Sequence, residues 1–258
     1  MSARLGGAIL ALLACWQAVV LLSGLPPYIL PAPAAVGHVL MTRADIILGH
    51  AAITAAEILA GLLLGTLLGA AAALAIDHAR LARTWLLPLV IASQAIPVFA
   101  LAPILVLWFG YGLASKVAMA ALIIFFPVTV AFLDGLRRTD TGWLDLARTM
   151  APAGRRGRFA ILLRIRIPAA LPAFGSGLRV AAAVAPIGAV IGEWVGSSAG
   201  LGHLMLHANG RMQIDLMFAA LSVLAALALT LYFAIDALLR RLMPWAPERF
   251  LDQSEEET

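Results

Sequence analysis

A serine and two histidines near residue 200 have the types and spacing of a hydrolase site. Residues 196–200 read Gly-Ser-Ser-Ala-Gly, which matches the G-x-S-x-G pattern around a nucleophilic serine, and His203 and His207 follow closely. A nucleophile elbow needs a strand before the serine and a helix after it. Here an apolar stretch of helical character ends near Trp194, just before Ser198. We therefore interpret the segment as a turn, and an intramembrane hydrolase built on Ser198 is the disfavoured alternative.

Metal and nucleotide chemistry also lack the residues that they need. His203 and His207 would lie on one face of a helix, but Asp215 is the only further ligand of suitable type in the same loop. Cys15 is the only cysteine, which excludes an intramolecular disulfide or a cysteine-based cluster. Lys116 is the only lysine, and no G-x-x-x-x-G-K-[ST] phosphate loop surrounds it. We predict a chain without catalytic residues, metal or cofactor of its own.

Two acids and an amide lie inside apolar stretches, where polar groups are costly enough to be candidates for function. They are Glu57, Glu193 and Gln94. Together with Pro97 and Trp194, they are our candidates for lining a translocation path. The alternative for both acids is a position at the membrane interface, and for Gln94 a hydrogen bond between helices.

The composition around these residues is that of a membrane protein. Hydrophobic residues make up 62% of the chain and charged residues 12%, whereas soluble domains average about a quarter charged. Apolar runs long enough to cross roughly 30 Å of hydrocarbon as helix lie at residues 5–24, 51–76, 85–109, 114–133, 168–194 and 215–239. We predict an all-α polytopic fold with six transmembrane helices. Prolines predict kinks in the third run and in the fifth.

The distribution of basic residues predicts the orientation of these helices. If the first helix enters from the cytoplasm, fourteen basic residues are cytoplasmic: Arg4, Arg80, Arg83, Arg137, Arg138, Arg148, Arg155, Arg156, Arg158, Arg164, Arg166, Arg240, Arg241 and Arg249. The opposite loops hold Arg43, Lys116 and Arg211. Because Lys and Arg accumulate on the cytoplasmic side, we assign both termini to the cytoplasm. The net charge of +4 therefore reflects topology, and we expect no nucleic-acid partner.

Three parts of the chain follow from this pattern. Residues 1–50 would form the first transmembrane helix and a proline-rich periplasmic connector, 51–243 the transmembrane domain, and 244–258 an acidic cytoplasmic tail. The second helix carries Gly61, Gly65 and Gly69 on one stripe, which favours close packing with another helix. Arg179, near the start of the fifth helix, is expected to extend to the membrane surface.

The longest cytoplasmic loop, residues 134–167, holds eight arginines and three aspartates and is interrupted by Pro152, Gly154 and Gly157. This pattern predicts a short helix, a turn and a second short helix. The loop is too short for a catalytic domain and too long for a simple turn, so we interpret it as a docking surface for another protein.

Several motifs resemble binding-protein-dependent ABC importer permeases. Residues 145–151 (Asp-Leu-Ala-Arg-Thr-Met-Ala), followed by Ile-Pro-Ala-Ala-Leu-Pro at 167–172, resemble the EAA loop of that family. Residues 28–33, 94–97, 107–110 and 177–179 are similar to the branch that transports nitrate, sulfonates, taurine and pyrimidine precursors. The resemblance covers residues 28 to about 243. Asp145 and Leu146 replace the Glu and first Ala of the motif, and Ala151 replaces its Gly.

The resemblance implies a type I importer transmembrane domain in a bacterial inner membrane, surrounded by lipid. It also implies a permease homodimer, a cytoplasmic ATP-binding subunit that uses ATP and Mg, and a periplasmic substrate-binding protein. The implied ATPase-coupling residues are Asp145, Leu146, Ala147, Arg148, Ala151 and Gly154.

The substrate expected from the resemblance is a small pyrimidine. Residues 185–196 and 209–213 are most similar to permeases for thiamine precursors of the hydroxymethylpyrimidine type. Anions such as nitrate, sulfonates or taurine are alternatives within the family. An ion-coupled secondary transporter that protonates Glu57 or Glu193 is the alternative outside it, and the lack of an inverted repeat argues against this class.

Overall fold

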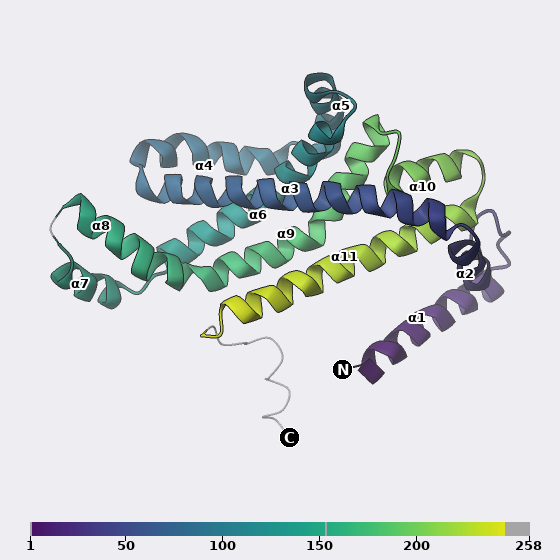
Figure 1. Ribbon diagram of the computed structural model, residues 1–258, viewed down its shortest axis with the longest axis horizontal. Coiled ribbons are helices and arrows are strands. Elements are labelled where there is room, and N and C mark those ends of the chain that lie inside the picture. Colours follow the sequence, from purple (N-terminus) through teal and green to yellow (C-terminus); the bar gives the residue numbers. More distant parts are fainter. Residues whose placement is uncertain (1, 153, 246–258) are drawn as a thin grey trace.

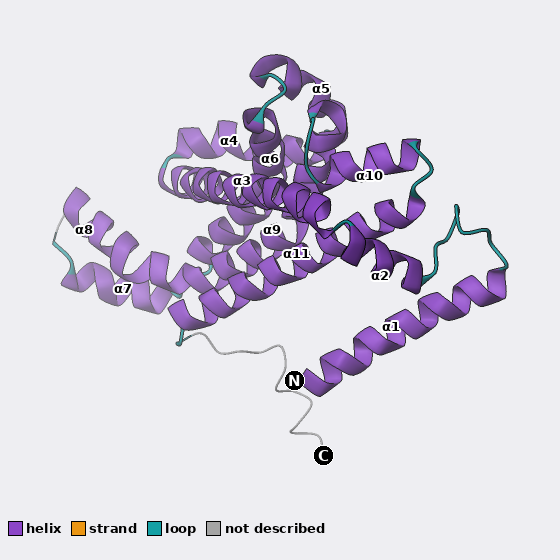
Figure 2. Cartoon of the chain, turned by 45° about the vertical axis from the view of Figure 1, so that its right-hand side comes forward, coloured by secondary structure: helices purple, strands orange, loops and turns teal. Residues whose placement is uncertain are grey.

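The computed structural model describes residues 2–152 and 154–245, and these ranges contain helices, turns and loops without a strand (Figures 1 and 2). The helices are α1 (Ser2–Ser23), α2 (Pro33–Thr42), α3 (Ala44–His78), α4 (Arg80–Ala95), α5 (Val98–Phe109), α6 (Leu113–Arg137), α7 (Thr141–Met150), α8 (Arg155–Ile161), α9 (Ile167–Gly196), α10 (Leu201–Gly210) and α11 (Ile214–Leu242). A π-helical turn, Leu162–Arg166, joins α8 to α9. The predicted acidic tail lies outside the described residues from position 246 onward.

Four stretches are long and apolar enough to cross a membrane: α3, α6, the continuous stretch Arg155–Gly196, and α11. The pair α4 and α5 would be a fifth span if it crosses as one unit. In α1, the apolar helix Leu10–Ser23 is shorter than these spans. The polytopic all-helical prediction is confirmed, while the sixth span and the orientation of the termini stay predictions.

The third predicted helix, residues 85–109, differs from expectation because it is two helices. The chain bends by 107° between α4 and α5. The break lies at Ile96 and Pro97, whose backbones are extended, with ψ of 120° and 119°. Proline lacks an N–H donor and disfavours the α conformation in the residue before it. Pro88 and Pro103, in contrast, remain inside helices.

The bundle core forms where α3, α6 and α9 cross (Figure 1). The predicted glycine stripe of α3 is confirmed as a contact with α6. A Cβ at Gly65 would lie 2.9 Å from the carbonyl oxygen of Ala121, and one at Gly69 would lie 3.0 Å from that of Phe125. These distances leave no room for a side chain, so the absence of a Cβ sets how closely the two backbones approach.

The two ends of the bundle differ. At one end, α2 and α10 pack on the beginnings of α3 and α11. At the other end, the C-terminal turns of α3 and α6 pack against α4 and the beginning of α9. The helices α7 and α8 project from this second end (Figure 1). The predicted short helix, turn and short helix of residues 134–167 are thus present.

Candidate functional site: a docking loop and a buried polar cluster

The loop of residues 134–167, here called the docking loop, is shaped by local hydrogen bonds. Asp140 is the N-cap of α7 and accepts hydrogen bonds from the N–H groups of Gly142 (2.6 Å) and Trp143 (3.3 Å), which satisfies two otherwise unpaired donors. Gly154 begins α8 with φ of 89°, a left-handed conformation that favours glycine. Asp140 therefore fixes the start of α7, and Gly154 lies in the turn between α7 and α8.

The helix α7 borders a groove on the surface of the protein. Ala147 is buried at 7% exposure and faces a groove of about 870 Å³, whose lining includes Gly135, Pro172 and Arg164. Leu146 and Met150 are exposed at 63% and 79%. Both residues line the same groove as Ala147. The surface available to another protein therefore includes this groove, where Leu146 and Met150 are accessible and Ala147 is buried.

The other predicted coupling residues also have defined places. Asp145 and Arg148 form an exposed ion pair of 2.8 Å within α7. Ala151 ends α7 and is half-buried. Gly157 was not among the predicted coupling residues, yet a Cβ there would collide with the carbonyl oxygen of Pro152. The only indication of this close contact in the sequence was that Gly157, like Pro152 and Gly154, interrupts the helical pattern of the loop.

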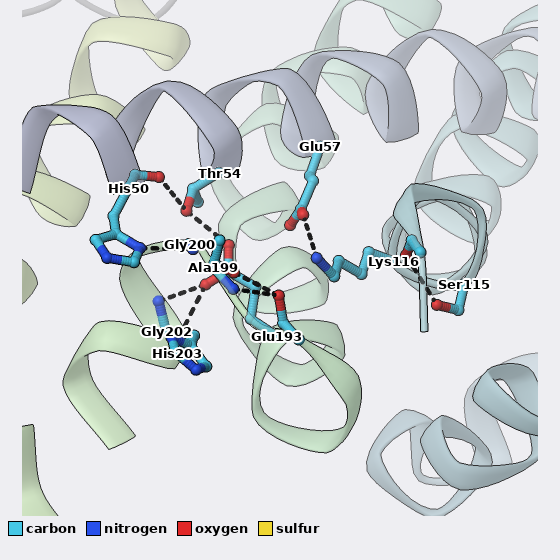
Figure 3. A network of polar contacts seen from close by, with 12 residues as sticks. His50, Thr54, Glu57, Ser115, Lys116, Glu193, Ala199, Gly200, Gly202 and His203 are labelled. Carbon is cyan, nitrogen blue, oxygen red and sulfur yellow. Dashed lines mark hydrogen bonds and ion pairs between the residues drawn. The ribbon is translucent and has the colours of Figure 1, made fainter. Parts of the chain in front are cut away.

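A buried polar cluster lies at the opposite end of α6 from the docking loop (Figure 3). Glu57 of α3 and Lys116 of α6 form an ion pair of 2.8 Å, and their exposures are 0% and 7%. Lys116 was expected to be one of three basic residues in the loops opposite the cytoplasm, and this placement is wrong. It sits in the first turn of α6, where its long side chain reaches inward to Glu57.

Glu193, the second acid of the cluster, caps α10. Its carboxylate accepts hydrogen bonds from the hydroxyl of Thr54 (2.6 Å) and from the N–H groups of Gly202 and His203. Thr54 also accepts a hydrogen bond from the N–H of Leu201 (2.8 Å). A helix N-terminus has unpaired donors and a partial positive charge, so a carboxylate is stabilised there.

Three histidines lie beside this cap. His50 Nδ1 accepts a hydrogen bond from the N–H of Gly200 at 2.9 Å (Figure 3). The ring of His203 lies 6.0 Å from that of His50 and 4.2 Å from that of His207. Burial, followed by the nearby His207, His50 and Lys116, lowers the pKa of His203 below its usual 6.5. Within residues 2–152 and 154–245, no group of three ligands could hold a metal.

The G-x-S-x-G segment forms the turn between α9 and α10. Ser197 hydrogen-bonds with Ala199, and Ser198 is exposed. The element before it is a helix, so the geometry of a nucleophile elbow is not present. Gly200, at φ of 112°, lies against the Glu193 carboxylate, where a Cβ would collide. The expected turn is confirmed.

The remaining predicted residues do not join the cluster. Gln94 is exposed in the last turn of α4, Pro97 is exposed at the break before α5, and Trp194 is 43% exposed. Arg179, expected to extend to the surface, instead donates to Asp236 of α11 at 2.6 Å. The predicted path residues therefore fall into two groups: two buried acids, and three residues on exposed faces.

Comparisons with a protein family and with individual proteins both indicate a membrane component of a transport system. Residues 61–246 match the family described as the binding-protein-dependent transport system inner membrane component. The chain is 57% identical to a probable ABC transporter permease protein of Haemophilus influenzae over 230 residues, which cover 89% of this chain and 92% of that protein.

Two further relatives have more specific names. The formylaminopyrimidine transport permease protein ThiX of Halalkalibacterium halodurans is 37% identical, with 92% of this chain and 93% of that protein covered. The riboflavin transport system permease protein RibX of Chloroflexus aurantiacus is also 37% identical, with 92% and 88% covered. Among solved structures, a chain of the inward-facing MetNI methionine ABC transporter superposes with a TM-score of 0.62 at 20% identity, covering 74% of this chain and 93% of that chain.

Proposed function

This chain belongs to the family of inner membrane components of binding-protein-dependent transport systems, as the permease subunit of an ABC importer, and we propose that its substrate is a small pyrimidine of the hydroxymethylpyrimidine type. Members of this family are membrane transport subunits and are not enzymes by themselves. Membership implies an ATP-binding partner and a substrate-binding partner.

The similarity to a formylaminopyrimidine permease supports a pyrimidine substrate. The equally similar riboflavin permease is named for another planar nitrogen heterocycle. Both names favour a flat heterocycle over a small anion such as nitrate or taurine. Riboflavin and taurine are therefore the competitors that a substrate test must include.

The observation that carries the docking assignment is the exposed helix pair α7 and α8. The face of α7 that borders the groove presents Trp143, Leu146 and Met150, each more than half exposed, and the ion pair of Asp145 and Arg148 lies on the same helix. Apolar anchors surrounded by charges are typical of protein interfaces. We assign this face to the cytoplasmic ATP-binding subunit, which hydrolyses ATP with Mg.

The translocation path is assigned to exposed surfaces that a second permease copy would cover. Gln94 and Pro97 lie at the bend between α4 and α5, and Trp194 lies near the end of α9. Glu57 and Glu193 are instead assigned to the stability of the bundle. Glu57 is paired with Lys116 and Glu193 caps α10, so both carboxylates already have partners inside one chain.

The test is uptake into proteoliposomes that contain the permease with its ATP-binding subunit. Substrate-binding protein and labelled hydroxymethylpyrimidine are added outside, and ATP or ADP is enclosed inside. We expect uptake with ATP and not with ADP, without an effect of an uncoupler. Excess unlabelled formylaminopyrimidine should compete, whereas riboflavin and taurine should not.

Each other result has a distinct meaning. Uptake of labelled riboflavin or taurine, with no uptake of the labelled pyrimidine, would refute the proposed substrate and leave the permease assignment intact. Uptake that persists with ADP and collapses with the uncoupler would favour the ion-coupled alternative. In that case Glu57→Gln should abolish the uncoupler-sensitive uptake.

A further inference from the structure

Arg166, at the junction between the docking loop and α9, binds two other helices at once. Its guanidinium donates two parallel hydrogen bonds to the carboxylate of Asp77, at 2.7 and 2.8 Å. It donates a third to the carbonyl oxygen of Leu136, at 2.8 Å. The side chain of Asp77 is only 8% exposed and that of Arg166 is 24% exposed. Bidentate, partly buried pairs of this kind are among the strongest side-chain hydrogen bonds.

Both partners of Arg166 need a cation for local reasons. Asp77 lies in the last turn of α3, which ends at His78, and a carboxylate is unfavourable at the negative end of a helix. Leu136 lies in the last turn of α6, where carbonyl oxygens lack partners within the helix. One guanidinium therefore neutralises the end of α3 and, together with the hydroxyl of Thr139 at 3.1 Å, caps the end of α6.

The backbone at Arg166 is also unusual. Residues 162–166 form a π-helical turn in which the N–H of Ile167 bonds to the carbonyl of Leu162, five residues earlier. Such widened turns are rare and often occur at functional positions. This one connects α8 of the docking loop directly to α9, so the side chain that leaves it can reach α3 and α6.

We propose that Arg166 is a positioning residue that holds the docking loop in a fixed orientation on the bundle through Asp77 and Leu136. Motion of α7 and α8 is then passed to α3 and α6 through this guanidinium as well as through α9. The structural part of the proposal concerns this chain alone. The transport part rests on the proposed function, because it requires an ATP-binding subunit that moves the docking loop.

The structural part is tested by limited trypsin digestion of the full chain in nanodiscs. Arg155, Arg156 and Arg158 are exposed sites in α8, and cleavage within a helix follows the population of its locally unfolded form. Asp77→Asn should raise the initial cleavage rate there by about tenfold, since a charge-assisted bond is lost. Asp45→Asn, at the opposite and exposed end of α3, is the matched control and should leave the rate unchanged.

The transport part is tested by counting substrate molecules taken up per ATP hydrolysed in the proteoliposomes. Asp77→Asn and Arg166→Lys should lower this ratio by about tenfold while basal hydrolysis stays the same. Arg83→Gln, an exposed arginine of α4, should not change it. If Asp77→Asn fails to insert, Arg166→Lys provides the same comparison. A merely structural pair would reduce uptake and hydrolysis in parallel.

The outcomes are separable from those of the proposed function. Wild-type chain that takes up no pyrimidine refutes the substrate, but the trypsin result still decides whether Arg166 holds the loop. Unchanged cleavage in both Asp77→Asn and Arg166→Lys overturns the proposal. Faster cleavage with an unchanged ratio of uptake to hydrolysis supports the structural part and overturns the transport part, because the loop would then be free without loss of coupling.

Discussion

Glu57 and Lys116 form a 2.8 Å ion pair that joins α3 to α6 where both side chains are almost completely removed from solvent. The second carboxylate oxygen of Glu57 is buried without a hydrogen-bond partner among the described residues. Charges in such an environment depend on each other, because neither can be solvated if its partner is removed. The effect of the pair on the free energy of unfolding is therefore largest when only one of the two residues is substituted.

Lys116→Met should lower the free energy of unfolding by about 3–5 kcal/mol, since it leaves the Glu57 carboxylate buried and unpaired. The double variant Glu57→Leu, Lys116→Met should recover most of this loss, because a packed apolar pair can replace a buried ion pair at little cost. Thermal unfolding in detergent measures both. Additive destabilisation in the double variant would contradict the coupling.

Gly65→Ala should destabilise the bundle by about 1–3 kcal/mol through overpacking, because its Cβ would lie 2.9 Å from the carbonyl oxygen of Ala121. Gly49→Ala is the matched control within α3, since a Cβ there has no atom within 4 Å. That variant should be neutral or slightly more stable, as alanine favours helix. Equal unfolding temperatures for the two variants would refute close packing of α3 on α6.

The pH dependence of stability should include a contribution from His203 on the short helix α10. Its pKa in the folded protein is lowered from 6.5 by burial and by neighbouring cationic groups, so protonation favours the unfolded chain. The stabilising contribution of neutral His203 is fully present above pH 6.5. It decreases as the pH falls from 6.5 toward the pKa of His203 in the folded protein. His203→Asn should reduce this decrease, and His38→Asn, an exposed histidine of α2, should not. Identical pH profiles would exclude His203 as the source.

Ala147→Arg should reduce co-purification of the ATP-binding subunit by about tenfold or more, the size of an interface hot spot. Ala147 faces a groove that already contains Arg138 and Arg164, so a third cation there would displace α7. Ala79→Arg adds the same charge at an exposed turn and is the control. Complex formation and uptake at the wild-type level, with normal membrane content, would refute the docking assignment.

The orientation in the membrane is testable with reporter fusions. Fusions after Arg158 and after Arg241 should report the cytoplasm, and a fusion near His203 should report the periplasm. The buried position of Lys116 strengthens this expectation, because only Arg43 and Arg211 then remain in the opposite loops. A periplasmic signal after Arg158 would invert the assignment.

Features that depend on neighbours in the sequence were predictable. The spacing of Gly61, Gly65 and Gly69 indicated a helix contact, and the breakers of the docking loop indicated two short helices. Pro97 indicated a distortion, although not its size. The extended conformation of both Ile96 and Pro97 produces the 107° angle, and a kinked single helix could not be distinguished from it by composition.

Pairings between distant residues could not be predicted. Lys116 and Glu57 are 59 positions apart, and Arg166 and Asp77 are 89 positions apart. Locally, Lys116 is only a charge at the edge of an apolar run, and Arg166 is only one of eight arginines in the docking loop. Only the crossing of α3 with α6 and the approach of the π-helical turn bring the partners together.

The length of α3 has a mechanical consequence. Its 35 residues span about 52 Å at 1.5 Å per residue, well beyond the roughly 30 Å of membrane hydrocarbon. It contains no proline, and it holds Thr54 in the cap of α10 near one end and Asp77 on Arg166 at the other. If such a rod tilts about its glycine contact with α6, its two ends move in opposite directions. The turn around Gly200 and the docking loop thus both contact the same unbroken helix, through Thr54 and Asp77.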